Sequence, residues 1–218
     1  MRLVAEDLSG ERGGEPVFSE IGFALESGQA LAVTGPNGSG KSTLLRVLCG
    51  LLPASNGNVR LEGGGDAFPT PAAACHYLGH HNAMKPALTV RENLDFWQRF
   101  ARESDGVLSG QAAALSVMEA LAAVGLDAIP HLPFGYLSTG QRRRVAIARL
   151  LVSFRPIWLL DEPTAGLDKA SEVRFAGLMK AHCSAGGIVV AATHSPLGLE
   201  EAGQLRMGAS SPSPQEAG

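Results

Sequence analysis

The sequence predicts an α/β fold with a mostly parallel sheet, an antiparallel β piece at the N-terminus and a helical insertion. Three observations indicate this fold. Short apolar runs rich in β-forming residues alternate with helix-length segments later in the chain, a pattern typical of parallel strands joined by crossover helices. The first two runs follow each other with no room for a helix between them. Residues 85–137, by contrast, show apolar residues at helical spacing and no strand pattern.

The expected elements follow from these patterns in chain order. Strands are expected at the apolar runs 2–8, 17–25, 30–34, 57–62, 75–80, 156–160 and 187–193. A helix is expected from Ser42, where "STLLRVLCGLL" follows a glycine-rich loop. Two further helices are expected over 89–102 and 111–126. Thr89 and Glu92 resemble a capping box at the start of the first of these two.

The chain has 218 residues, enough for one large domain with a buried core. We expect that domain over 1–207. Within it we expect a helical subdomain over about 85–137, which one more helix extends to about 152. The tail 208–218 is rich in Ser, Pro and Gly and is expected to be flexible.

Charge and cysteine usage narrow the class of protein. A net charge of −3 and a pI of about 6.1 disfavour a general nucleic-acid binder, which is usually basic. The three cysteines form no C-x-x-C pair, so we expect buried thiols in a reducing compartment rather than disulfides or a metal site. No apolar run approaches the ~20 residues of a membrane span, and the N-terminus lacks a secretory pattern. We therefore expect a soluble, cytoplasmic protein that meets a membrane only through a partner.

The stretch "VTGPNGSGKSTLL" from Val33 to Leu45 matches the phosphate-loop pattern G-x-x-x-x-G-K-[ST]. Its glycines permit backbone angles that turn consecutive N–H groups toward an anion, and the following helix adds its positive end. An ordinary glycine-rich turn is the alternative, but the strand before the loop and the helix after it favour nucleotide binding. The predicted binding residues are Gly35, Pro36, Asn37, Gly38, Ser39, Gly40, Lys41, Ser42 and Thr43.

Acidic residues follow the buried strand in "RPIWLLDEPTAGLD", residues 155–168. Asp161 would hold Mg²⁺ at the strand tip, mostly through water, together with the hydroxyl of Ser42. Glu162 would orient and deprotonate the attacking water, and Lys41 would contact the outer phosphates. A solvated turn is the alternative for the two acids. Their place after a phosphate loop favours Mg²⁺-dependent hydrolysis of a nucleotide.

The block "LSTGQRRRVAIARLL" from Leu137 resembles the signature of ABC-type ATPases. This resemblance implies the ABC ATPase fold and hydrolysis of ATP by two copies of the chain, closed head to tail over two ATP molecules. Ser138 would cap a helix whose bare amides form a second phosphate site. Thr139 stands where glycine is commonest and is tolerated if its side chain points away from the nucleotide. The implied trans contacts come from Ser138, Thr139, Gly140 and Gln141.

Further positions match the family or depart from it. Asp168 in "AGLD" falls where the family has its D-loop aspartate, between the two subunits. His194 falls at the switch histidine, which contacts the γ-phosphate and positions the attacking water. Arg12 stands where an aromatic residue commonly stacks on adenine, and a guanidinium can also stack on a base. His81 stands where a glutamine senses Mg²⁺, and a neutral imidazole could accept the same hydrogen bond. His80 is expected to be structural.

The phrase "LGHHNAMKPALTVRENLDFW" is similar to the ATP-binding subunits of cytochrome c biogenesis (haem exporter) systems. This similarity implies a peripheral protein on the cytoplasmic face of the bacterial inner membrane. It would pair with a membrane subunit resembling CcmB and work with CcmC. ATP binding would close the dimer and hydrolysis would reopen it, driving haem export or release of a haem-loaded chaperone.

Three other functions remain open at this stage. The chain could be the ATPase of another ABC exporter, for a lipid, a drug or an ion. It could be a soluble ABC ATPase acting on nucleic acid or ribosomes, although such chains usually carry a second ATPase half or long coiled coils. A small-molecule kinase would explain the phosphate loop but leave "LSTGQ" unexplained.

The three consecutive arginines after "LSTGQ" also have a plain alternative. Arg142, Arg143 and Arg144 could form a solvated face of the helix.

Overall fold

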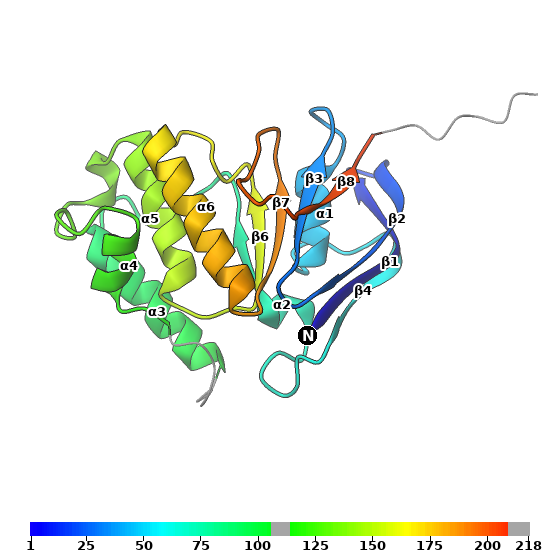
Figure 1. Ribbon diagram of the computed structural model, residues 1–218, viewed down its shortest axis with the longest axis horizontal. Coiled ribbons are helices and arrows are strands. Elements are labelled where there is room, and N and C mark those ends of the chain that lie inside the picture. The colour runs from blue at the N-terminus through cyan, green and yellow to red at the C-terminus, as the bar shows by residue number, and fades with distance from the viewer. Residues whose placement is uncertain (106–113, 209–218) are drawn as a thin grey trace, which may run out of the picture.

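The computed structural model describes residues 1–105 and 114–208. At its centre lies a parallel sheet of five strands in the order β5-β6-β7-β3-β8 (Figure 1). Strands β6 and β7 are buried along their whole length, which explains their unbroken apolar sequences. The strands are β3 (Ala30–Thr34), β5 (Cys75–Leu78), β6 (Ile157–Asp161), β7 (Ile188–Ala192) and β8 (Gly203–Arg206).

A second, antiparallel sheet has the order β2-β1-β4. Its strands are β1 (Arg2–Arg12), β2 (Glu15–Glu26) and β4 (Asn56–Glu62). The expected antiparallel β piece is thus confirmed, and β4 joins it as a third strand that the sequence did not assign to it. Both residues of the turn between β1 and β2, Gly13 and Gly14, have positive φ angles of 63° and 84°, as a tight hairpin turn requires.

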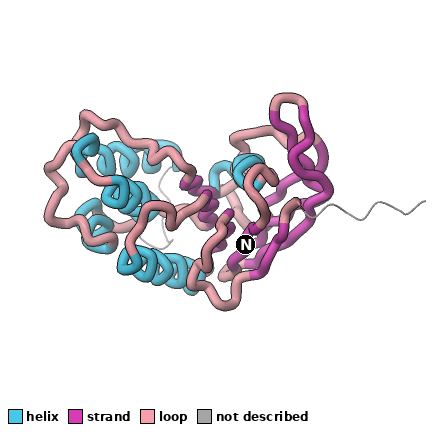
Figure 2. The backbone as a smooth tube through the Cα atoms, turned by 90° about the horizontal axis from the view of Figure 1, so that it is seen from above, coloured by secondary structure: helices cyan, strands magenta, loops and turns pink. Residues whose placement is uncertain are grey.

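Helices cover the two faces of the parallel sheet unequally. Figure 1 places α1 (Lys41–Leu48) between the two sheets and α5 and α6 against the opposite face of the parallel sheet. Seen from above in Figure 2, most helices gather at one end of the molecule and the antiparallel strands at the other. The remaining helical elements are α2 (Pro71–Ala74), α3 (Val90–Asp105), α4 (Val117–Ala123), the 3-10 helix η1 (Phe134–Tyr136), α5 (Thr139–Leu151) and α6 (Lys169–Ser184).

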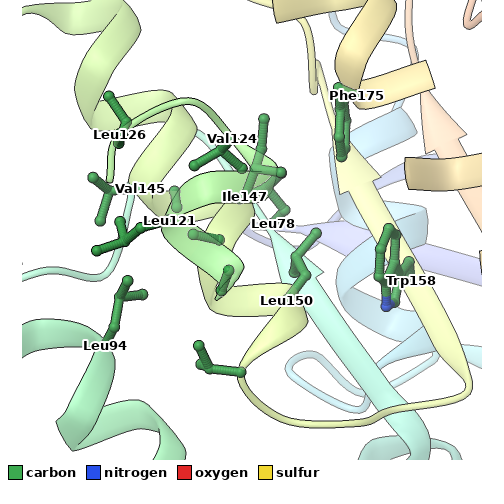
Figure 3. Packing of buried hydrophobic residues seen from close by; sticks show 14 of the residues in the cluster. Leu78, Leu94, Leu121, Val124, Leu126, Val145, Ile147, Leu150, Trp158 and Phe175 are labelled. Carbon is green, nitrogen blue, oxygen red and sulfur yellow. The ribbon is translucent and has the colours of Figure 1, made fainter. Parts of the chain in front are cut away.

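Successive residues of β6 contribute to opposite cores, because side chains alternate along a strand. Ile157 and Leu159 pack with α1 and the antiparallel sheet. Trp158 and Leu160 belong to the cluster beneath α3, α4, α5 and α6. Figure 3 shows this helical-side cluster, with Leu78 of β5 among side chains from the helices. Both cores therefore hold β6 in place, and with it the end of the strand at Asp161.

The helix starts partly match the expected positions. The capping box at the start of α3 is confirmed, because Glu92 N donates to Thr89 Oγ1 and Thr89 N donates to Glu92 Oε2. The helix expected from residue 111 starts later: α4 begins after Ser116, which caps it together with Glu119. The first residues of that expected helix, up to 113, lie outside the described residues, as does the expected flexible tail apart from Gly208.

Three elements were not expected from the sequence: α2, the 3-10 helix η1 and the edge strand β8. β8 pairs with β3 in parallel, and its sequence "GQLR" carries a single apolar residue. Over 85–152 the described residues form helices and one isolated β-bridge, between Thr89 and Pro133. Within the described ranges, no helix combines the length and the apolar character required to cross a bilayer. All three cysteines are free thiols.

Candidate nucleotide-binding and hydrolysis site

The loop between β3 and α1 adopts the backbone that its glycines predict. Gly35, Gly38 and Gly40 have φ angles of 142°, 85° and 89°, in the region that side chains disfavour. A Cβ atom at Gly35 would collide with the carbonyl oxygen of Met207, and one at Gly40 would lie 3.1 Å from Val17 Cγ1. Glycine is therefore required here by both backbone angle and space.

Polar groups of this loop face its interior. Lys41 is only 8% exposed. Its ammonium donates to the carbonyl oxygens of Gly35 at 2.7 Å and Pro36 at 2.9 Å, so the buried charge has hydrogen-bond partners. The hydroxyl of Ser39 is buried and has no hydrogen-bond partner within the described part of the chain. A buried hydroxyl without a partner is unfavourable unless a ligand contacts it, so the loop is suited to phosphate oxygens.

Asp161, at the end of β6, is held from several sides. It is 1% exposed, and its Oδ1 accepts a hydrogen bond from Ser42 Oγ at 2.9 Å. Its Oδ2 accepts one from the Tyr77 hydroxyl at 3.1 Å, and that hydroxyl accepts one from Arg46 Nε at 3.3 Å. Burial raises the pKa of Tyr77, which keeps the phenol protonated as a donor. The hydroxyl and carboxylate oxygens of Ser42 and Asp161 are the hard ligands that Mg²⁺ prefers.

The structure exchanges the expected places of the two adjacent histidines. His80 Nε2 lies 3.6 Å from Asp161 Oδ2 and lines the cavity at the phosphate loop. His81 is exposed and does not line that cavity. The role predicted for His81 stays a prediction, but in the structure it is His80 that lies beside Asp161. β5 ends at Leu78, so His80 is the first of the two histidines to follow the strand end.

Glu162 and His194 meet at the same edge of the sheet. Glu162 has a φ of 44°, unusual for a residue with a side chain, and its N–H donates to the carbonyl of Ala192 at 2.9 Å. His194 Nε2 lies 3.6 Å from Glu162 Oε1 and 3.0 Å from Asn37 Oδ1. Residues predicted from three separate motifs thus converge around the phosphate loop.

A cavity of about 280 Å³ lies between the phosphate loop, Asp161 and Glu162, and His194 is not part of its described wall. Arg12, predicted at the place of the adenine-stacking residue, is in its wall together with Lys41, Ser42, Asp161 and Glu162. Among the described residues, the cavity wall contains no Phe, Tyr or Trp side chain. The full lining comprises Arg12, Val17, Asn37, Gly38, Gly40, Lys41, Ser42, Thr43, His80, Asp161 and Glu162.

The signature residues lie away from this cavity. Ser138 caps α5 by accepting from Gln141 N at 3.2 Å, while Gln141 Oε1 accepts from Ser138 N at 2.9 Å. Ser138 and Thr139 are exposed, and none of residues 138–141 lines the cavity that the described residues form. Asp168 also lies outside it and caps α6, because its Oδ1 accepts from Ser171 N at 2.7 Å.

The three consecutive arginines of α5 are not a solvated face. Arg143 is 5% exposed, and burial lowers its pKa. Arg142 donates to Gly135 O, and Arg144 donates to the carbonyls of Val124 and Gly125. The helical period could have revealed the buried one, since Arg143 shares a face with Ile147 four residues later. Tyr77 and Arg46 gave no such signal, because neither stands in a recognisable motif.

Comparisons with known proteins agree with this geometry. The family model described as ABC transporter matches residues 18–165. A protein of Mesorhizobium japonicum named "Cytochrome c biogenesis ATP-binding export protein CcmA" is 67% identical over 95% of this chain and 98% of its own length. Proteins of the same name are 61% identical in Brucella abortus, over 93% of this chain and 89% of theirs, and 59% in Rhizobium meliloti, over 95% and 98%.

Solved structures show the same fold. A putative ABC transporter ATP-binding protein from Pyrococcus furiosus superposes with a TM-score of 0.77 at 21% identity, covering 95% of this chain and 98% of that one. The ATP-binding subunit of another ABC transporter superposes with a TM-score of 0.76, over 95% and 86% of the two chains. With the phosphate loop, the paired acids and the capped signature helix in place, the chain is an ATPase that belongs to the ABC transporter family, in the group named CcmA.

Proposed function

We propose that this ATPase powers an export step of cytochrome c biogenesis, either haem export or the release of a haem-loaded chaperone. The convergence of Lys41, Asp161 and Glu162 at one cavity, with His194 3.6 Å from the Glu162 carboxylate, is the observation that supports ATP hydrolysis. The name shared by relatives at 59–67% identity supports the pathway. That name favours this cargo system over an exporter of lipids, drugs or ions.

The residues of this chain divide the work of binding ATP. The amides of the phosphate loop and the Lys41 ammonium bind the phosphates, while Arg12 lies at the cavity wall where the base would stack. Ser42 and Asp161 would hold Mg²⁺, with His80 beside them in contact with Asp161. When bound, Mg²⁺ neutralises charge on the phosphate oxygens.

Two residues act on the attacking water. Glu162 is next to the Mg²⁺-binding aspartate, and its carboxylate accepts the proton of that water. His194 orients the water, because its imidazole lies between Glu162 Oε1 and the Asn37 side chain of the phosphate loop. This arrangement places the base and the orienting group on neighbouring strand ends, where a buried sheet holds both rigidly.

A second copy of the chain completes each site. The exposed tip of α5, from Ser138 to Gln141, would contact the γ-phosphate bound by the partner copy. Asp168 would lie between the two copies. The dimer would sit on the cytoplasmic face of the inner membrane, bound to a CcmB-like subunit and working with CcmC. Closure on ATP and reopening after hydrolysis would drive that membrane subunit.

One experiment tests the enzyme and its setting together. The full chain is extracted from membranes in mild detergent, its co-purifying membrane protein is identified, and ATP turnover is compared between wild type and Glu162→Gln. We expect a CcmB-like protein in both preparations. The variant should bind ATP, lose at least ~100-fold in turnover and accumulate as a closed dimer, because only the base is removed.

Three outcomes would contradict separate parts of the proposal. Turnover retained by Glu162→Gln would remove Glu162 as the base. Co-purification with an unrelated permease would instead leave the ATPase intact and replace cytochrome c biogenesis by another export pathway. Absence of the chain from washed membranes would favour a soluble ABC ATPase.

A further inference from the structure

Arg143 lies in the second turn of α5, one turn after the exposed tip, and its side chain points into the protein. It is 5% exposed. Its guanidinium donates to four backbone carbonyls: Nη1 to Gly79 at 2.7 Å, Nη2 to Glu162 at 2.8 Å and Asp161 at 3.0 Å, and Nε to Pro163 at 3.1 Å. A planar fork of N–H groups is the side chain best suited to four separate acceptors.

The four acceptors belong to the two loops that carry the reactive groups. Asp161, Glu162 and Pro163 are consecutive residues at the end of β6, and Gly79 directly precedes His80 at the end of β5. The Arg143 side chain is therefore hydrogen-bonded to the backbone at the ends of both β5 and β6. It makes these bonds from α5, the helix whose tip carries the signature residues.

Glu162 needs such support more than its neighbours do. Its φ of 44° is disfavoured for a residue with a Cβ atom, and such angles persist only where surrounding contacts hold them. Its N–H is fixed by the carbonyl of Ala192, and its carbonyl by Arg143. Without Arg143, the peptide after Glu162 would lose the partner that sets its direction, and the carboxylate would move with it.

We propose that Arg143 is a positioning residue for Glu162: from the signature helix, it holds the backbone that aims the catalytic base. The inference rests on the proposed role of Glu162 as that base. It also links two parts of the ATPase cycle, because a shift of the α5 tip on the partner's ATP would be transmitted through Arg143 to the acids of its own site.

The test replaces Arg143 by Lys, which keeps the charge but offers its donors from a single nitrogen. The matched control is Arg144→Lys, because Arg144 also donates to two backbone carbonyls from α5, but to Val124 and Gly125 outside the site. The full chain is assayed in its detergent-extracted complex. We expect Arg143→Lys to lower kcat about 30-fold, with affinity for a non-hydrolysable ATP analogue within about 3-fold of wild type. The control should stay within about 3-fold in both.

A double variant separates positioning from loss of stability. If Arg143 acts through Glu162, Arg143→Lys should leave the residual single-turnover rate of Glu162→Gln unchanged within about 3-fold. Thermal unfolding of each variant gives the assay temperature at which every chain is folded. A purely structural role would lower the melting temperature and reduce the rate equally in both backgrounds.

Each result decides one question. An equal, independent loss in the Glu162→Gln background, or full turnover by folded Arg143→Lys, would overturn the positioning role while leaving Glu162 as the base. Full turnover by Glu162→Gln would overturn the proposed mechanism, and this inference with it. A joint loss of kcat and analogue binding would place Arg143 in nucleotide binding instead, and would also overturn the inference.

Discussion

Two partly buried histidines have lowered pKa values, which favours the neutral ring at neutral pH. His76 on β5 is hydrogen-bonded through Nε2 to the carbonyl of Ser153 at 2.8 Å, and burial lowers its pKa to about 3. His182, near the end of α6, stacks on Trp158 with ring centroids 4.1 Å apart, and burial lowers its pKa to about 4. Protonation of either ring would place a charge in an apolar interior.

These pKa values make the protein sensitive to acid. Below about pH 6.5 the unfolded chain binds protons at both histidines while the folded chain does not, so the free energy of unfolding falls as pH falls toward 4. Above pH 6.5 neither histidine contributes to the slope. Between pH 7.5 and 5.5 we expect each to lower the free energy of unfolding by about 1.4 kcal/mol.

Urea titrations at these two pH values check this expectation. His76→Gln should reduce the pH-dependent loss by about 1.4 kcal/mol relative to wild type, whatever it does to stability at pH 7.5. An unchanged loss in His76→Gln would show that the ring is protonated in the folded state.

At the level of single residues, sequence alone could identify motif members but not their orientation. The glycines of the phosphate loop, Asp161 and Glu162 were recognisable because their chemistry requires fixed residue types. The choice between His80 and His81 depended on where β5 ends, and a short strand has no sequence mark for its last residue. The helical period could mark Arg143 as the buried one of the three arginines, but not its carbonyl partners at the end of β6.

Among the secondary-structure elements, α4 and α5 start alike. Each has a capping box, with Ser116 and Glu119 on α4 and Ser138 and Gln141 on α5. In both, the serine hydroxyl accepts the N–H of the residue three positions later. Comparing the two serine caps therefore separates the stability that a cap contributes from any effect of a contact with a partner's ATP.

We expect Ser116→Ala and Ser138→Ala to lower the free energy of unfolding by similar amounts, about 1 kcal/mol each, because each removes one cap. Only Ser138→Ala should suppress ATP turnover strongly, by roughly 10-fold or more, if the α5 tip contacts a γ-phosphate. Denaturant unfolding and steady-state turnover give the two readings. Equal turnover in both variants would reduce Ser138 to a helix cap.

Elements with strong periodicity were predictable and weakly patterned ones were not. The buried strands β6 and β7 were predictable from their unbroken apolar sequence, and α3 from its capping box. The edge strand β8 did not, because its place comes from pairing with β3 rather than from its own residues. The four-residue helix α2 is too short to show a period.

At the scale of the whole molecule, the cavity lies at the carboxyl ends of β3, β5 and β6, where ligands of parallel sheets commonly bind. The tip of α5 is exposed and separate from it. The phosphate loop and the proposed phosphate-binding tip of α5 therefore do not face one common cavity, which favours the proposal that two copies share each site.

Mixing two inactive variants tests this sharing. Lys41→Ala chains lack the phosphate-loop lysine, and Ser138→Ala chains lack the helix tip, so each should be nearly inactive alone. A mixed dimer contains one site with Lys41 from one copy and Ser138 from the other. With random pairing, half of the dimers carry one intact site, and turnover should recover to about a quarter of wild type. No recovery after subunit exchange would mean that each chain works by itself.

The left-handed backbone at Glu162 sets stability against the proposed catalytic role of this residue. Glycine would adopt that angle with far less strain, so replacing the glutamate by glycine would relieve backbone strain. The chain keeps the more strained residue at the position proposed for the catalytic base. Such a trade-off between stability and activity recurs in enzymes. Loss of the activity would thus be an easy step for this fold, one that leaves its shape untouched and its nucleotide still bound.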